Sequence, residues 1–289
     1  MADVAIMTDS NSGMTQERAK ELGVELIAMP FLVNDHVYFE GIDLSQEQFF
    51  RYLQEGAEVS TSQPAPGVLV DTWKRLLQTH DEVVYIPMSG GLSNSCMTAL
   101  ALSQEYDGKV QVVDNKRISV PQYQSVLDAL LLAERGLDAA NIKKELERTA
   151  EIFSIYVTVD TLKYLKKGGR ISGTAAVLGT MLNVKPVLWL GADQLEAVSK
   201  CRGMKAARRT MLELMKKDLE GRLKPWYDQG RIRLMTAYTN VSEEQIAQWN
   251  QEVKDVLGVS EVETAPLTLS ISCHLGPGAL AVGAAYAES

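Results

Sequence analysis

Short apolar runs that stop at polar turns recur through the first half of this 289-residue chain. The run at residues 4–7 ends at Thr8-Asp9-Ser10, and the run at residues 83–88 ends at a Ser-Gly-Gly-Leu-Ser turn. Runs of this length with turn residues at their ends are typical of buried strands. Helix-like segments lie between the runs, and strands that alternate with helices predict a parallel sheet with helices on its faces.

The other elements expected in this half follow the same alternation. The apolar run at residues 24–33 is interpreted as one strand, and the polar stretch from Thr15 to Gly23 has the capping residue and the stop of a helix. The remaining expectations are a strand at residues 110–113 and helices at 43–53, 94–104, 122–135 and 138–150. Together they predict an N-terminal, mainly parallel α/β domain at residues 1–155.

The pattern changes after a strand expected at residues 155–159. Residues 187–190 and 195–198 flank Gly191-Ala192-Asp193 and are expected to pair as a hairpin. Strands at 232–238 and 262–267 and helices at 204–219 and 242–257 are expected to follow. This order predicts a C-terminal α+β domain at residues 156–289 with a mixed or antiparallel sheet.

The composition excludes several classes of protein. A net charge of -8 and a pI of about 5.1 disfavour nucleic acid binding, which needs a basic footprint to neutralise phosphates. The cysteines, Cys96, Cys201 and Cys273, form neither a disulfide framework nor a Cys-x-x-Cys zinc pair. We find no signal peptide and no apolar stretch near the ~20 residues of a membrane span, so a cytoplasmic protein is expected.

Hydroxyl-rich turns are the first candidates for a binding site. They lie at residues 8–10, 61–64 and 89–93, and ligands of an open parallel sheet bind where its strands end. Ser93 stands at an expected helix start, where free N–H groups favour an anion, and Gly90-Gly91 lets backbone approach a ligand. The alternatives are that Ser93 caps its helix and that the glycine pair makes a tight turn.

Arg170 and His274 are the candidates in the second half. Arg170 follows Gly168-Gly169 in a stretch, residues 168–189, that joins an arginine, small hydroxyl residues and a long apolar surface. Such a surface suits a ligand with an anionic head and an apolar body. His274 is expected between a β-rich run and Gly276-Pro277-Gly278, which would aim its ring, although a structural histidine is equally compatible with this position.

Charged residues elsewhere have two interpretations. The lysines before Arg170 are expected to be solvated charges at a helix end. A second basic set is expected at the start of the helix at residues 204–219, either as a wet face or as a docking patch for an acidic partner; it comprises Lys200, Arg202, Lys205, Arg208 and Arg209.

Catalytic patterns are weaker. Ser93 and His274 occur in an order that a Ser hydrolase or acyltransferase allows, but the turn around Ser93 lacks the second glycine of a nucleophile elbow. The sequence contains no Gly-x-x-x-x-Gly-Lys-Ser/Thr phosphate loop, and its histidines lack the spacing of a metal centre. A signalling role through protein contacts also stays open.

The turns at residues 61–64 and 89–93, the block from Gly168 to Gly203 and the His274-to-Ala279 element resemble the DegV family of bacterial fatty-acid-binding proteins. The resemblance implies two α/β domains that hold one long-chain fatty acid in a tunnel between them. It further implies a carrier without catalytic residues, metal or cofactor, which presents the acid to a separate ATP-dependent fatty acid kinase for acyl-phosphate formation in phospholipid metabolism.

The same resemblance assigns roles to individual residues. It implies that Thr61 and Ser93 donate hydrogen bonds to the ligand carboxylate, with Ser62 and the backbone around Gly91 beside them. His274 is expected to help hold the head group, with Arg170 near it. The segments at residues 94–96 and 114–120 depart from the family pattern, which leaves the acyl-chain preference open. We expect a monomer that makes at most transient contact with a membrane.

Overall fold

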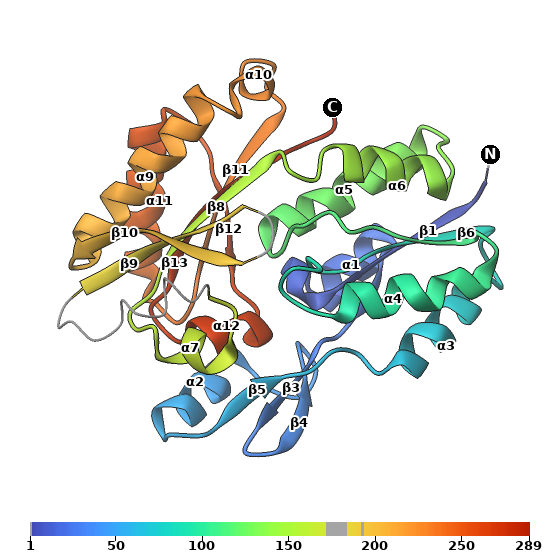
Figure 1. Cartoon of the computed structure of the whole chain (residues 1–289), viewed down its shortest axis with the longest axis horizontal. Helices are drawn as coiled ribbons and strands as arrows, with labels where there is room; N and C mark the ends of the chain where they lie inside the picture. The colour runs from blue at the N-terminus through green and yellow to red at the C-terminus, as the bar shows by residue number, and fades with distance from the viewer. Residues whose placement is uncertain (1, 172–183, 192–193) are drawn as a thin grey trace. The chain divides into compact units, whose positions relative to one another are not determined.

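The computed structural model describes residues 2–171, 184–191 and 194–289 (Figure 1). They form two compact units. Unit 1 comprises Met1–Ser45, Ala57–Glu151 and Glu288, and unit 2 comprises Gln46–Gly56, Ile152–Ala287 and Ser289. Unit 1 contains two sheets and unit 2 contains one, and each unit has buried hydrophobic clusters of its own.

Unit 1 is built on the parallel sheet that the alternation of strands and helices predicts. Its strand order is β2-β1-β6-β7, and every neighbouring pair is parallel. The strands are β1 Val4–Asp9, β2 Glu25–Ile27, β6 Glu82–Ile86 and β7 Val110–Val112. Its helices are α1 Gln16–Leu22, α3 Pro66–Leu76, α4 Ser95–Ser103, α5 Val120–Glu134 and α6 Ala139–Arg148.

Successive residues of the strands serve the two faces of this sheet. On one face Ile6, Val84 and Ile86 pack in a cluster with side chains of α5 and α6. On the other face Met7 and Tyr85 pack in a second cluster with side chains of α3 and α4. Because both faces are covered, the carboxyl ends of the strands are the part of the sheet from which loops can reach a ligand.

A second, antiparallel sheet corrects the expected single strand at residues 24–33. That run divides into β2 and β3 Pro30–Val33, and β3 lies between β4 His36–Phe39 and β5 Val59–Thr61. The division falls where Met29 N donates to Ser10 Oγ at 3.0 Å, just before Pro30, which has no N–H for a ladder. His36 belongs to a strand, and Asn34 and Asp35 form the hairpin turn with positive φ of 48° and 65°.

Unit 2 contains a mixed sheet, as the second half of the sequence predicts. Its order is β10-β9-β8-β13-β11-β12, and only the β11-β12 pair is parallel. The strands are β8 Phe153–Thr158, β9 Val184–Leu190, β10 Leu195–Arg202, β11 Ile232–Tyr238, β12 Glu263–Pro266 and β13 Leu280–Tyr286. The predicted hairpin is therefore confirmed as β9 and β10.

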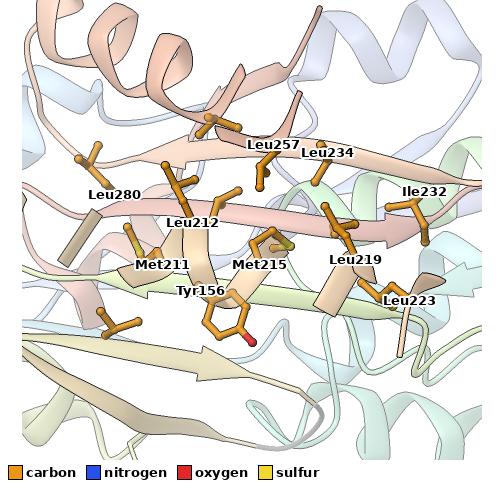
Figure 2. Close-up of a cluster of buried hydrophobic side chains, with 14 of the residues drawn as sticks. Tyr156, Met211, Leu212, Met215, Leu219, Leu223, Ile232, Leu234, Leu257 and Leu280 are labelled. Atoms are coloured by element: carbon orange, nitrogen blue, oxygen red, sulfur yellow. The ribbon is translucent and has the colours of Figure 1, made fainter. Parts of the chain in front are cut away.

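Side chains of α9 Met204–Glu220 and α11 Glu243–Leu257 pack in one buried cluster with strands of this sheet. The other helices among the described residues of unit 2 are α2 Gln46–Gln54, α7 Lys163–Gly168, α10 Lys224–Tyr227 and α12 Leu269–Leu275. Figure 2 shows Met211 and Met215 of α9 in one buried cluster with Tyr156, Leu234 and Leu280 of the strands. Among the described helices none is long and apolar enough to cross a membrane.

Candidate functional site

The loop between β6 and α4 carries two of the candidate residues, Gly91 and Ser93. The backbone N–H groups of residues 88–90 are bonded to acceptors outside this loop, at the end of β1 and in the connection after β7. Met88 N donates to Asp9 Oδ2 at 2.8 Å, Ser89 N donates to the carbonyl oxygen of Arg117 at 2.8 Å, and Gly90 N donates to Asp114 Oδ1 at 3.2 Å. Residues 88–93 are called the head-group loop below. The three hydrogen bonds hold the backbone at the start of this loop in place.

The second half of the head-group loop folds on itself. Gly91 N donates to Ser89 Oγ at 3.2 Å, and the N–H groups of Leu92 and Ser93 point to the carbonyl oxygen of Ser89 at 3.1 and 3.2 Å. Ser93 Oγ accepts a hydrogen bond from Ser95 N, the first residue of α4, at 3.2 Å. The hydroxyl of Ser93 thus supports the helix start and still has its own proton to donate.

Thr61 and Ser62 lie at the end of β5 in the same unit. Thr61 is half-buried and Ser62 is exposed, with Ser62 N bonded to the carbonyl oxygen of Pro30 at 3.2 Å. The next residue, Gln63, accepts a hydrogen bond from Thr98 of α4 at 3.1 Å. This contact ties the turn after β5 to the helix that follows Ser93.

The side chains of the turn at residues 8–10 make hydrogen bonds within unit 1. Thr8 Oγ1 donates to the carbonyl oxygen of Ile86 at 2.7 Å, and Ser10 Oγ holds Met29 N. All three side chains are buried. Burial raises the pKa of Asp9 to about 6, although hydrogen bonds from Met88 N and Gln122 act in the opposite direction. The hydroxyls of this expected ligand turn are thus engaged inside unit 1.

In unit 2, His274 lies on α12 and Arg170 follows α7, and these two short helices pack together. A Cβ at Gly168, the last residue of α7, would lie 2.1 Å from His274 Nδ1 on α12. A Cβ at Gly276, just after α12, would lie 2.3 Å from the ring of Tyr164 on α7. Each glycine therefore leaves room for a ring of the other segment.

His274 lies in α12, a helix that was not expected, whereas the strand expected at residues 262–267 is confirmed as β12. Residues 269–275 contain one β-branched residue, Ile271, so their local preference for a strand is weak, and they pack as a helix against α7. Burial, with a smaller effect of the Arg170 charge, lowers the pKa of His274 to about 4. The imidazole is neutral near pH 7 and can donate one hydrogen bond.

Arg170 and the loop after His274 are also held by backbone contacts. The half-buried Arg170 donates from its guanidinium to the carbonyl oxygen of Gly168. Thr239 Oγ1 donates to the carbonyl oxygen of Gly276 at 2.6 Å and accepts from Ala279 N at 2.9 Å. Thr239 fixes the ends of the Gly-Pro-Gly turn, and sequence reasoning missed it because its position after β11 gives no local signal.

The second basic set does not form one helix face. Lys200 and Arg202 lie on β10, whereas the other members begin α9. Arg208 pairs with Glu252 at 3.1 Å and Arg209 pairs with Glu213 at 2.8 Å, so both charges have carboxylate partners. The expected helix-start patch is thereby reduced, because a carboxylate lies beside each of these two arginine charges.

The part of the chain that the structure describes holds no cluster of metal-binding side chains. The strand-to-helix connection around Ser93 also differs from a nucleophile elbow, since β6 ends at Ile86 and α4 begins only at Ser95. The serine of an elbow sits on a sharp turn between the two elements, a requirement that this long connection does not meet.

A unit with a parallel α/β sheet and a second unit with a mixed sheet define a protein of the mixed α and β class. The family model described as uncharacterised protein, DegV family, matches residues 3–287. The chain belongs to the DegV family.

Relatives agree over nearly the whole length. A DegV domain-containing protein of Deinococcus radiodurans is 31% identical over 280 residues, 96% of this chain and 97% of that protein. A DegV family protein of Thermus thermophilus, whose structure reports fatty acid binding, has a TM-score of 0.87 and 33% identity over 98% of this chain and 99% of its own. DegV of Bacillus subtilis, a fatty acid binding protein, has a TM-score of 0.85 and 27% identity over 99% and 100%.

Proposed function

We propose that this chain is a cytoplasmic, monomeric carrier that binds one long-chain fatty acid and presents its carboxylate to a separate fatty acid kinase. The observation that carries the proposal is the 33% identity to the fatty-acid-binding Thermus protein over 98% of the chain. The carrier has no catalytic residue of its own. The kinase would transfer phosphate to the presented acid, and the acyl phosphate would enter phospholipid synthesis.

The apolar tail supplies most of the affinity. Burial of about fifteen methylenes at ~0.8 kcal/mol each contributes on the order of 12 kcal/mol before ordering costs are subtracted. Burying a carboxylate costs several kcal/mol unless hydrogen bonds compensate. The head group is therefore expected to set orientation, whereas the tail sets the strength of binding.

The proposed site takes its polar groups from both units. In unit 1 the hydroxyls of Thr61 and Ser93 donate to the carboxylate, with Ser62 and the backbone of Gly91 next to them. In unit 2 the neutral imidazole of His274 donates a further hydrogen bond, an assignment that its lowered pKa supports. The domains proposed for this carrier are residues 1–155 and 156–289.

Arg170 receives a separate role. Its guanidinium lowers the pKa of His274, so the charge acts where the head group is expected. A planar guanidinium is well suited to phosphate oxygens. We assign Arg170 to the phosphate-transfer complex. Arg170→Gln is expected to keep the lipid and to slow acyl-phosphate formation by the kinase.

Lipid that copurifies with the protein tests the carrier. Native mass spectrometry of the wild type is expected to show an added mass in the fatty-acid range, and extraction followed by chromatography identifies the acid. The Thr61→Ala/Ser93→Ala variant is expected to lose it. Ser60→Ala/Ser103→Ala is the matched control, because Ser60 is the exposed neighbour of Thr61 and Ser103 ends α4 with its hydroxyl bonded to Leu100 O.

Two results would contradict the proposal. One is a wild-type protein that is empty and takes up neither palmitate nor oleate. The other is covalent labelling of Ser93 by a fluorophosphonate probe, since only an activated nucleophile reacts with this reagent.

A further inference from the structure

Asp9 is a buried carboxyl at the end of β1 that uses both of its oxygens. Oδ2 accepts from Met88 N at 2.8 Å. Oδ1 accepts from Asn11 N at 2.9 Å and from Gln122 Nε2 at 3.2 Å. All of these partners are N–H donors, and a carboxylate offers an acceptor oxygen to each side, whereas an asparagine would turn an NH2 group toward one of the donors.

Gln122, which donates to Asp9, also links β1 to a second strand and to a helix. Its Nε2 also lies 3.2 Å from Thr8 Oγ1 and 3.1 Å from the carbonyl oxygen of Ile86. Gln122 belongs to α5, and Ile86 ends β6 immediately before the head-group loop. Asp9 and Gln122 thereby join β1, β6 and α5 at the point where the loop begins.

We propose that Asp9 is a positioning residue for head-group binding, which fixes the start of the loop that carries Gly91 and Ser93 without touching the ligand itself. The inference rests on the proposed function. Its physical basis is that a hydroxyl donor can discriminate a carboxylate only if its backbone is held in place. The hydrogen bond from Met88 N is the contact that transmits this constraint.

Asp114 provides an internal comparison. It follows β7 and also binds the head-group loop, through Oδ1, which accepts from Gly90 N at 3.2 Å and from Lys116 N at 3.4 Å. Among the described contacts Asp114 uses this one oxygen, which an asparagine retains. Asp9 needs two acceptors, and an asparagine there would turn an NH2 group toward an N–H donor. Asp9→Asn and Asp114→Asn are therefore the same chemical change with different expected results.

The test compares two ligands that share a tail. Palmitic acid and 1-hexadecanol have the same chain, but only the acid offers a carboxylate. Asp9→Asn is expected to weaken acid binding roughly ten-fold, as for a lost hydrogen bond to a charged group, and to leave alcohol binding unchanged. Asp114→Asn is expected to bind both ligands as the wild type does.

Hydrogen exchange without lipid gives the second readout. The Met88 amide is expected to exchange faster in Asp9→Asn than in the wild type, while the Gly90 amide keeps its rate in Asp114→Asn. If Asp9→Asn does not fold, Gln122→Met removes one donor to Oδ1 at similar volume. It is expected to lower acid affinity in the same direction by a smaller factor.

The outcomes separate the two proposals. A wild type that binds neither ligand overturns the proposed function and this inference with it. A wild type that binds the acid, together with a folded Asp9→Asn or Gln122→Met variant whose acid-to-alcohol ratio is unchanged, overturns the inference and leaves the carrier intact. Equal loss of both ligands in Asp9→Asn also overturns it, since positioning would affect only the carboxylate.

Discussion

The candidate residues of unit 1 and those of unit 2 are held in place in different ways. In unit 1 the head-group loop is fixed by hydrogen bonds from its backbone to Asp9, Arg117 and Asp114. In unit 2 His274 is fixed by close contact between two short helical segments, through glycines that leave no room for a methyl group. The position of the head-group loop should be sensitive to loss of a hydrogen-bond acceptor. The position of His274 should be sensitive to any carbon atom added at the glycines.

The largest expected effect is at Gly168. In Gly168→Ala the new Cβ would come 2.1 Å from His274 Nδ1, so the ring or the helix must move. Overpacking of this kind costs about 1–3 kcal/mol, and the thermal midpoint is expected to fall by several degrees. Gly67→Ala is the control, because its Cβ meets nothing within 4 Å. Equal midpoints for the two variants would show that α7 and α12 are not tightly packed.

The next effect concerns the pH dependence of stability. The folded-state pKa of His274 is about 4, below its usual 6.5. The contribution of His274 to the stability of the fold is therefore fully present above pH 6.5 and is lost as pH falls toward 4. The loss is at most about 3 kcal/mol. Chemical denaturation between pH 4.5 and 7.5 is expected to show the wild type losing stability relative to His274→Gln as pH falls. Parallel curves would contradict a buried neutral imidazole.

Asp9 is expected to show the opposite trend. Its folded-state pKa of about 6 lies above the usual value of 3.8. Its contribution to stability is therefore fully present below pH 3.8 and is lost as pH rises through 6. Direct titration of the Asp9 carboxyl by NMR measures the midpoint without a variant. A midpoint near 4 would mean that the donors from Met88, Asn11 and Gln122 outweigh burial.

Two buried tyrosines give a smaller contrast between the units. Tyr85 of unit 1 has no hydrogen-bond partner for its hydroxyl among the described residues, whereas Tyr156 of unit 2 donates to Asp218 at 2.9 Å. Tyr85→Phe is expected to be neutral or to stabilise by about 1 kcal/mol, and Tyr156→Phe to destabilise by about 1 kcal/mol. Urea unfolding of both variants measures the difference; a loss of stability in Tyr85→Phe would indicate a partner for its hydroxyl.

The smallest effect is electrostatic and involves Arg170. Its charge is the lesser cause of the lowered pKa of His274, after burial. Arg170→Gln is expected to raise the pKa of His274 while leaving it below 6.5. The imidazole proton signals followed by NMR over pH provide the measurement, with Lys167→Gln as a control at a neighbouring exposed cation. An unchanged midpoint would place Arg170 too far from the ring to act on it.

Local patterns predicted the parallel sheet of unit 1 and the mixed sheet of unit 2, but not the antiparallel sheet of β3, β4 and β5. The start of α11 is set by a capping box between Ser242 and Gln245, and β9 and β10 form the expected hairpin. The DegV resemblance and the mixed α/β fold are confirmed by the family match and the structural neighbours.

Features that depend on distant contacts could not be predicted. The division of residues 24–33 depends on a hydrogen bond from Met29 to Ser10, and α12 depends on packing against α7. Neither leaves a trace in the local pattern. The domain boundary at residue 155 and the ligand roles of Thr61, Ser62, Gly91, Ser93, Arg170 and His274 stay predictions.

Gly168 packs against His274, and Gly276 packs against Tyr164. This reciprocal packing restricts how α7 and α12 can move relative to each other. Two surfaces that each carry a protruding ring and a matching hollow cannot slide past one another without first moving apart. The imidazole ring is therefore expected to rotate only when α7 and α12 move together. A displacement of α7 should then move the side chain of His274 with it.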